Sequence, residues 1–479
     1  MIDRIKMNER PAQERNKDFN EVNLGYTPEQ AQSEAKRCIQ CKNPLCVQGC
    51  PVEINIPGFI KGIADGDMNK ALEVLKDKNN LPAVCGRVCP QEEQCELKCI
   101  LGKKGKPVAI GYLERFTADW EQKNSKLEVG SRKMEVTAKT KDKSSSVPPL
   151  VKGDEGGFKV AVVGSGPAGL TAAGDLAKMG YDVTIFESLH DTGGVLRYGI
   201  PEFRLPSAIL DFELNSLTKS GVKVCLNCLV GRTKSVDELF KEGFKAVFVG
   251  TGAGLPGFLN VPGENLNHIY SANEFLVRVN LMRGFEFPNY DTPVFIGKKV
   301  VVVGGGNTAM DAARTSLRLG AEEVTLAYRR SMEEMPARVE EVHHAEEEGI
   351  KFMMLTNPVK FIGDEKGFVT AMEAVKMELG EPDESGRRRP KVIPGSNFTM
   401  PVNMAVIAIG LSPNPVLPSL TKGLERDKWG HLIIDDNFMT TLPGVFAGGD
   451  IVGGETVIQA MGMGKRAARA MDAYLKNTK

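Results

Sequence analysis

The sequence predicts an α/β protein in which a helical N-terminal domain precedes two Rossmann-like nucleotide-binding domains. Two observations lead to this prediction. Eight of the ten cysteines lie between Cys38 and Cys99, in a region with few strand signals. Further along, residues 159–188 and 299–331 each contain an apolar β-branched run, a Gly-rich turn, an Ala-rich helical stretch and a second apolar run. That order is typical of a βαβ unit, and the chain contains it twice.

The composition excludes several classes of function. The 479 residues include 61 Lys and Arg and 61 Asp and Glu, so no net charge favours nucleic acid or an anionic membrane. The N-terminus lacks the apolar segment of a secretion signal, and no run of about 18 apolar residues indicates a membrane span. We therefore expect a cytoplasmic protein of several domains, with no nucleic-acid or membrane partner.

The N-terminal domain is expected over residues 1–120. Thr27 and Pro28 are a helix N-cap and a first helical residue, and the helix that they begin leads to the first cysteines. Residues 121–157 are rich in Lys, Ser, Pro and Gly and poor in large apolar residues, so we interpret them as a linker.

The eight N-terminal cysteines form two groups, each with a Cys-Pro pair. The groups are Cys38, Cys41, Cys46 and Cys50, and Cys85, Cys89, Cys95 and Cys99. A reducing cytosol argues against disulfides. Zinc sites favour paired C-x₂-C knuckles, and only one such spacing occurs among the eight. The spacing C-x₂-C-x₄-C-x₃-C-P fits iron–sulfur ligation better, with zinc as the alternative.

The first βαβ unit carries the pattern G-x-G-x-x-G at Gly164, Gly166 and Gly169, directly between a strand and a helix. These glycines allow a tight turn, the approach of a pyrophosphate and close helix–strand packing. Glu187 ends the second strand, where an acid bonds ribose hydroxyls. Far downstream, AGGD ending at Asp450 resembles the C-terminal flavin motif of two-dinucleotide flavoproteins, in which the Asp bonds the ribityl chain. The first unit is therefore predicted to bind FAD.

The second unit carries the allowed variant G-x-G-x-x-A, ending at Ala309. Its second strand ends at Arg329 and Arg330, where the first unit has Glu187. A carboxylate repels a 2′-phosphate, whereas guanidinium groups bind phosphate in a bidentate way. The unit is therefore predicted to take NADP(H) as substrate; the alternative is that both arginines are solvated charges. The nearby run of residues 387–389 is interpreted as an exposed hairpin.

Apolar segments at 243–253 and 403–415 are expected to cross between the two units. The NADP(H)-binding domain is accordingly predicted over residues 286–402, inserted in an FAD-binding domain of residues 158–285 and 403–479. The residues predicted to bind FAD are Gly164, Gly166, Pro167, Ala168, Gly169, Glu187, Gly194, Leu196, Arg197, Thr251, Gly252, Gly449, Asp450, Thr456 and Val457. Those predicted to bind NADP(H) are Gly304, Gly305, Gly306, Asn307, Thr308, Arg329 and Arg330.

Arg197 is also a catalytic candidate. It lies in GGVLRYG, directly after the first βαβ unit, and its positive charge would stabilise anionic reduced flavin. The alternative is a structural hydrogen-bond donor.

The order of a cysteine-rich helical domain, a GSGPAG fold, a GGGNTAMD fold followed by YRR, and an AGGD tail resembles the small-subunit family of NADPH glutamate synthase. Within that family the likeness is strongest to the electron-bifurcating transhydrogenases, the reduced ferredoxin:NADP⁺ oxidoreductases. Residues 41–64, 81–116 and 193–206 carry this likeness.

The resemblance implies an oxidoreductase that passes hydride from NADPH to FAD and single electrons through two [4Fe–4S] clusters to ferredoxin. A smaller FAD/[2Fe–2S] partner subunit would reduce NAD⁺. The alternative is the electron-donating subunit of glutamate synthase, paired with its large subunit. A non-catalytic scaffold or zinc module is disfavoured because the nucleotide-binding motifs are intact.

By position, the resemblance also implies the cluster ligands. One cluster would use Cys38, Cys41, Cys46 and Cys99, and the other would use Cys50, Cys89, Cys95 and Glu114. The alternative is that Glu114 is a helix-surface charge and Cys85 is the eighth ligand.

Overall fold

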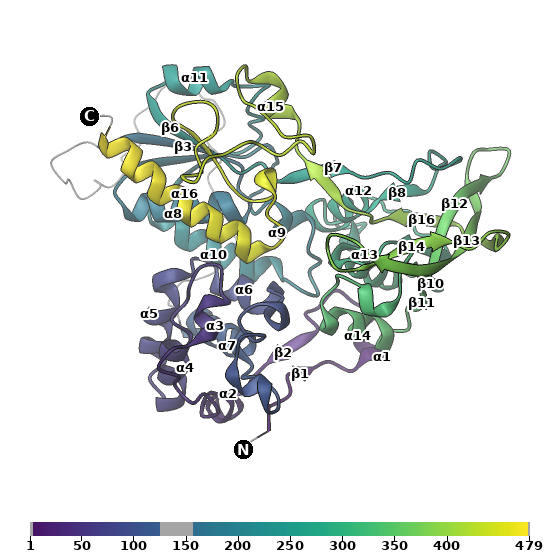
Figure 1. Ribbon diagram of the computed structural model, residues 1–479, viewed down its shortest axis with the longest axis horizontal. Helices are drawn as coiled ribbons and strands as arrows, with labels where there is room; N and C mark the ends of the chain where they lie inside the picture. The colour runs from purple at the N-terminus through teal and green to yellow at the C-terminus, as the bar shows by residue number, and fades with distance from the viewer. Residues whose placement is uncertain (1–2, 125–156, 478–479) are drawn as a thin grey trace.

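The computed structural model describes residues 3–124 and 157–477, which form three units (Figure 1). The predicted fold class is confirmed, because a helical unit precedes two units built on parallel sheets. Most of the predicted linker, residues 125–156, lies outside the described residues. No helix in the described ranges combines the length and apolarity needed to cross a membrane.

The cysteine unit, residues 3–124, is helical apart from one short β-ribbon. Its elements are β1 Asn8–Glu9, α1 Ala12–Arg15, β2 Asn23–Gly25, α2 Pro28–Ala35, α3 Leu45–Gln48, α4 Ile56–Asp65, α5 Met68–Lys78, α6 Pro82–Val88 and α7 Ile110–Asn124. Thr27 caps α2, as the sequence predicts, and it also forms a reciprocal capping box with Gln30. The helix α7 continues through residues 121–124, so the linker prediction began too early.

The first nucleotide unit, residues 157–256 and 411–477, contains a five-stranded parallel sheet in the order β18-β6-β3-β4-β5. Its strands are β3 Lys159–Val163, β4 Asp182–Phe186, β5 Lys223–Cys225, β6 Phe244–Val249 and β18 Val445–Ala447. Its helices are α8 Pro167–Lys178, α9 Val195–Tyr198, α10 Ser207–Lys219, α11 Val236–Lys241, α15 Val416–Leu420 and α16 Val457–Asn477. Alternate residues of β3 belong to two different hydrophobic clusters, so the sheet is buried on both faces.

The second nucleotide unit, residues 257–410, contains a parallel sheet in the order β11-β10-β9-β16-β8. Its strands are β8 Ile269–Ser271, β9 Lys299–Val303, β10 Glu323–Ala327, β11 Lys351–Met353 and β16 Met404–Ile407. Its helices are α12 Ala272–Leu276, α13 Asn307–Arg318 and α14 Val339–Glu347. An antiparallel sheet of β12 Thr356–Gly363, β13 Val369–Pro382, β14 Arg388–Val392 and β15 Phe398–Pro401 extends from it.

The sheet pairing places both boundaries of the second unit outside the predicted range. The predicted range 286–402 excludes β8 and β16, yet β16 pairs with β9 and β8 pairs with β16 in the same sheet. The chain passes between the two nucleotide units through an antiparallel ribbon of β7 Ala253–Pro256 and β17 Leu411–Pro413. The boundary therefore lies at this ribbon, because hydrogen-bond partners separated by more than 100 residues define the sheet.

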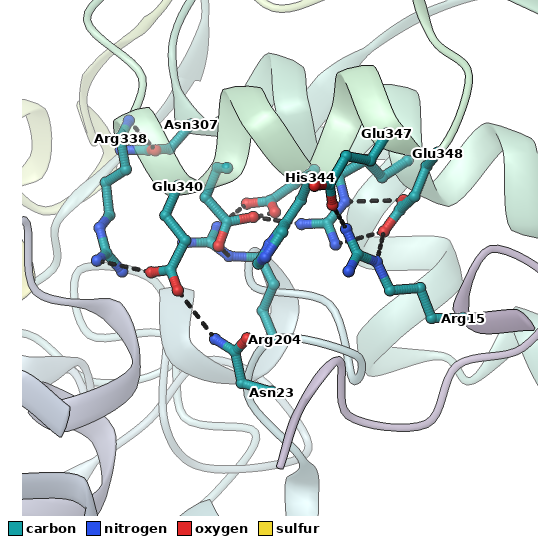
Figure 2. A network of polar contacts seen from close by, with 12 residues as sticks. Arg15, Asn23, Arg204, Asn307, Arg338, Glu340, His344, Glu347 and Glu348 are labelled. Atoms are coloured by element: carbon teal, nitrogen blue, oxygen red, sulfur yellow. Dashed lines mark hydrogen bonds and ion pairs between the residues drawn. The ribbon is translucent and has the colours of Figure 1, made fainter. Parts of the chain in front are cut away.

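A buried ionic network joins the N-terminal segment to α13 and α14 (Figure 2). Arg15 Nε lies 3.1 Å from Glu348 Oε1, and Arg314 and Arg318 donate to the same carboxylate at 2.7–3.0 Å. Burial alone would raise the pKa of Glu348, but Arg314 and Arg318 hold that pKa well below its usual range. The carboxylate is therefore charged and compensates three guanidinium groups.

We expect Glu348→Gln to lower the free energy of unfolding by about 3–5 kcal/mol, because it leaves buried guanidinium groups uncompensated. Chemical denaturation measures this change, and Glu346→Gln, an exposed change beside it, should cost less than about 0.5 kcal/mol. The lowered pKa also means that the carboxylate stabilises the wild type above about pH 4.5 and less as the pH falls below that value. Equal stability of Glu348→Gln and wild type at pH 7 would contradict the compensating role.

Candidate functional site

A cavity of about 850 Å³ lies along the edge of the first sheet where the parallel strands end. Ligands of open α/β sheets bind at this edge, because helix N-termini and turns converge there. Most of the residues predicted to bind FAD line this cavity: Gly164, Gly166, Pro167, Ala168, Glu187, Gly194, Thr251, Gly252, Gly449, Asp450, Thr456 and Val457.

The Gly-rich turn of this cavity requires glycine at two positions. Gly164 has a φ of +98°, and a Cβ there would lie 2.4 Å from the carbonyl oxygen of Gly250. A Cβ on Gly169 would lie 2.0 Å from the carbonyl oxygen of Gly164, so the helix approaches the strand as the motif predicts. Glu187 accepts hydrogen bonds from Ser165 N at 2.9 Å and Ser165 Oγ at 2.6 Å. Its carboxylate therefore lies on the cavity wall and also holds the turn.

Three residues predicted to bind FAD do not line the cavity. Gly169 packs behind the turn, and Leu196 is buried in the hydrophobic core. Arg197 donates to the carbonyl oxygen of Thr192 at 3.2 Å and pairs with Asp211, away from the cavity wall. These contacts agree with the structural alternative for Arg197, and its placement near the isoalloxazine stays a prediction.

The arginine on this cavity wall is Arg204, which is 9% exposed. It belongs to the same segment, GGVLRYGIPEFRLP, seven positions after Arg197. Sequence reasoning missed it because no local pattern distinguishes the two arginines. The tight turns of residues 199–206 decide which of them reaches the cavity.

A second cavity, of about 390 Å³, lies at the corresponding edge of the second sheet. The predicted residues on its wall are Gly304, Gly305, Gly306, Thr308, Arg329 and Arg330. Arg329 is exposed. Arg330 is buried and donates to Asp383 Oδ2 at 2.6 Å and to the carbonyl oxygen of Arg388 at 2.8 Å. Arg329 is therefore better placed than Arg330 to bind a phosphate.

Arg387 also lines this second cavity. It lies in the turn between β13 and β14, so the predicted hairpin is present but its first arginine points toward the site. The β-hairpin folds over the end of β10, which brings Arg387 and Arg329 together from positions 58 residues apart in sequence. Sequence reasoning had no signal for this approach.

The two cavities share part of their walls. Asn273, Thr308, Gly410 and Leu411 line both cavities. Asn307, predicted to bind NADP(H), lines the first cavity. Its side-chain amide is oriented by Arg338 N, which donates to Asn307 Oδ1 at 3.0 Å. Ligands in the two cavities can therefore meet at this shared wall.

Four thiols converge on a third cavity, of about 250 Å³, in the cysteine unit. They belong to Cys38, Cys41, Cys46 and Cys99, which are the set assigned to one cluster. The first two follow α2, Cys46 lies in α3, and Cys99 comes from a segment more than 50 residues later. None of these four forms a disulfide bond. Four converging thiols fit the ligand set of a [4Fe–4S] cluster.

The other four cysteines of this unit lie around α6 and α7, and Glu114 lies among them. Burial raises the pKa of the Cys50 and Cys95 thiols, and the neighbouring Glu114 carboxylate adds to both rises. A hydrogen bond with Cys85 and then burial raise the pKa of Cys89. Glu114 is 5% exposed, so it is not a helix-surface charge. Three thiols and a buried carboxylate also fit a cluster.

Asn79 contacts both candidates for the eighth ligand, Glu114 and Cys85. Its Nδ2 donates to Glu114 Oε1 at 2.6 Å, and the Cys85 thiol approaches its Oδ1 at 3.7 Å. The Cys85 thiol also contacts Met461 Sδ at 3.5 Å. Cys85 therefore contacts α16 through Met461 and also lies beside the Cys89 thiol.

The buried cysteines Cys50 and Cys89 lie next to residues that border the first cavity. Val88 and Pro90, the neighbours of Cys89, line that cavity. A Cβ on Gly462 of α16 would lie 2.6 Å from the carbonyl oxygen of Pro51, the residue after Cys50. The order in space is therefore the second cavity, the first cavity, the buried cysteine group and then the cavity of Cys38.

Two family models match the chain in this order. The model described as dihydropyrimidine dehydrogenase domain II, 4Fe-4S cluster, matches residues 15–126. The model described as pyridine nucleotide-disulphide oxidoreductase matches residues 158–464. Together they show a flavin and NADP-dependent oxidoreductase that carries an iron–sulfur cluster.

Curated relatives match nearly the whole chain. The glutamate synthase [NADPH] small chain of Halomonas elongata is 37% identical over 97% of this chain and 95% of its own length. That of Escherichia coli is 35% identical over 99% and 98%. The NADP(+)-dependent formate dehydrogenase subunit beta of Moorella thermoacetica is 41% identical over 90% of this chain and 60% of its own length.

Solved structures show the same fold in the two nucleotide units. FprA of Mycobacterium tuberculosis in complex with NADPH has a TM-score of 0.56 and 21% identity, over 67% of this chain and 85% of its own. Thioredoxin reductase of Lactococcus lactis has a TM-score of 0.51 and 20% identity, over 67% and 99%. With the cysteine unit, the two family models and the full-length relatives, these findings show that the chain belongs to the glutamate synthase small-chain family of NADP-dependent flavin and iron–sulfur oxidoreductases.

Proposed function

We propose that this chain is the electron-input subunit of a larger oxidoreductase. It oxidises NADPH and delivers electrons one at a time through two [4Fe–4S] clusters to a partner. The observation that carries the proposal is the shared wall of the two cavities, with the cysteine groups following in line. When bound, FAD supplies hydride chemistry and the clusters supply one-electron transfer.

The residues of the chain have distinct parts in this proposal. Arg329 and Arg387 bind the 2′-phosphate, and the turn at Gly304–Gly306 places the pyrophosphate at the N-terminus of α13. Glu187 and Asp450 hold the ribose and ribityl hydroxyls of FAD on the first cavity wall. Burial raises the pKa of Asp450 to about 6, so a hydroxyl partner compensates its desolvation.

Two observations support the choice of partner: the relatives, and the surface beside the cavity of Cys38. The relatives at full length favour the large subunit of glutamate synthase over the bifurcating assembly of a smaller FAD/[2Fe–2S] subunit and ferredoxin. Ile39, Leu45 and Ile100 are exposed around the cavity of Cys38. This apolar rim is where we expect either partner to dock.

Anaerobic purification with its native partner tests the function. We expect one FAD and about eight iron atoms per chain, and bleaching of the flavin by NADPH far faster than by NADH. A large amidotransferase subunit in the complex supports glutamate synthesis, and a small flavin/[2Fe–2S] subunit supports bifurcation. Zinc in place of iron, or a flavin that NADPH does not bleach, would refute the proposal.

For the nucleotide preference, we expect Arg329→Ala with Arg387→Ala to lower kcat/KM for NADPH by about 10- to 100-fold. The reason is the loss of charge-assisted bonds to the 2′-phosphate. The value for NADH should change less than about threefold. Arg389→Ala, an exposed change in the same hairpin, is the matched control. Equal losses with both nucleotides would contradict the assignment.

For the eighth ligand, we expect Glu114→Gln to change the electron paramagnetic resonance spectrum and the potential of one cluster only. An amide replaces an anionic oxygen there, which shifts the charge at the iron. Cys85→Ser should leave both spectra as in the wild type. The opposite pattern would assign Cys85 in place of Glu114.

A further inference from the structure

We propose that Arg204 is a positioning residue that holds the second nucleotide unit against the first, so that the two cavities keep their shared wall. The proposal rests on the function above, because it concerns the geometry of hydride transfer between those cavities.

Arg204 forms a two-sided ionic contact across the junction of the units. It belongs to the first unit, in the segment between α9 and α10. Its Nη1 donates to Asp311 Oδ1 at 2.8 Å and Oδ2 at 2.7 Å, and its Nε lies 3.0 Å from Glu341 Oε1. Asp311 lies in α13 and Glu341 in α14, both in the second unit. One guanidinium group of the first unit therefore forms ion pairs with two helices of the second unit.

The contact is buried, and Arg204 is the cation from the first unit that faces both carboxylates. Arg204 is 9% exposed, Asp311 3% and Glu341 4%. Burial alone would raise the pKa of Glu341, but Arg204 and Arg314 hold it at about 2, so this carboxylate is charged. Without Arg204, Asp311 would face Glu341 without the guanidinium that separates them. Charge repulsion and hydration would then favour separation of the units at this point.

Asp311, which Arg204 binds, lies in the helix that directly follows the Gly-rich turn of the second unit. Asp311 is one helical turn after Asn307, the first residue of α13. Asn307, Thr308 and Asp311 all line the first cavity, and Thr308 lines the second as well. A shift of α13 relative to Arg204 would therefore move the shared wall and the turn together.

Two other polar contacts attach Arg338 and Glu340, at the start of α14, to the cysteine unit instead. Arg338 donates to Gln91 Oε1 at 3.0 Å, and Tyr112 Oη donates to Glu340 Oε1 at 3.1 Å. Both contacts lead to the cysteine unit and not to the first nucleotide unit. They can keep the second unit attached to the cysteine unit, whereas Arg204 determines the distance between the two cavities.

The test compares Arg204→Met with Lys465→Met in the FAD- and cluster-loaded complex. Lys465 forms a buried ion pair with Asp175 at 2.7 Å, but both residues lie in the first unit. We expect Arg204→Met to lower the limiting rate of flavin bleaching at saturating NADPH by about 100-fold, as small misplacements of reacting groups do. The Kd for NADP⁺ should stay within about threefold of the wild type, and Lys465→Met should bleach at the wild-type rate.

Amide hydrogen exchange supplies a readout that does not depend on activity. Residues 304–311 should lose protection in Arg204→Met and keep it in Lys465→Met. Asp311→Asn should reproduce the Arg204→Met effects, and the double variant should be no slower than either single variant. Arg204→Lys should restore only part of the rate, because an ammonium cannot hold both helices in the fork geometry.

Three results would overturn the proposal. One is wild-type bleaching and wild-type protection in Arg204→Met. Another is a rate loss matched by an equal loss of NADP⁺ affinity, which would make Arg204 a nucleotide-binding residue. The third is full rescue by Arg204→Lys, which would make its charge beside the flavin the important property. A wild-type flavin that NADPH fails to bleach would refute the proposed function instead.

Discussion

Buried contacts between guanidinium groups and carboxylates determine how the three units of this chain are assembled. Arg15 of the cysteine unit and Arg204 of the first nucleotide unit each pair with the region of α13 and α14. Arg338, at the start of α14, pairs in turn with Glu92 of the cysteine unit. Removing such charges from water is costly unless every partner is in place, so these pairs favour one arrangement of the units over all others. The shared wall of the two cavities is a consequence of that arrangement.

The helix α16 has a comparable part in joining the flavin cavity to the cysteine unit. Its first turn lines the cavity, and its Gly462 packs against the backbone beside Cys50. Because a side chain at that glycine would separate the units, the close approach depends on the absence of a Cβ. Electron transfer between bound groups is favoured by short separations, which this contact maintains.

Sequences similar to this chain occur in relatives whose names refer to different enzymes. Glutamate synthase small chains match over their full length, whereas the formate dehydrogenase subunit beta contains this chain's equivalent in 60% of its length. Under the proposed function, the apolar rim beside Cys38 would meet a different partner in each of these assemblies.

Local patterns alone determined the two βαβ units, their Gly-rich turns and the grouping of the cysteines. The reason is that a turn, a helix cap or a ligand spacing depends on residues only a few positions apart. Tertiary structure decided which arginines reach the cavities: Arg204 lines the first, and Arg387 joins Arg329 on the wall of the second. It also assigned β8 and β16 to the second sheet. These outcomes depend on hydrogen bonds and charge pairs between distant segments, which no local pattern records.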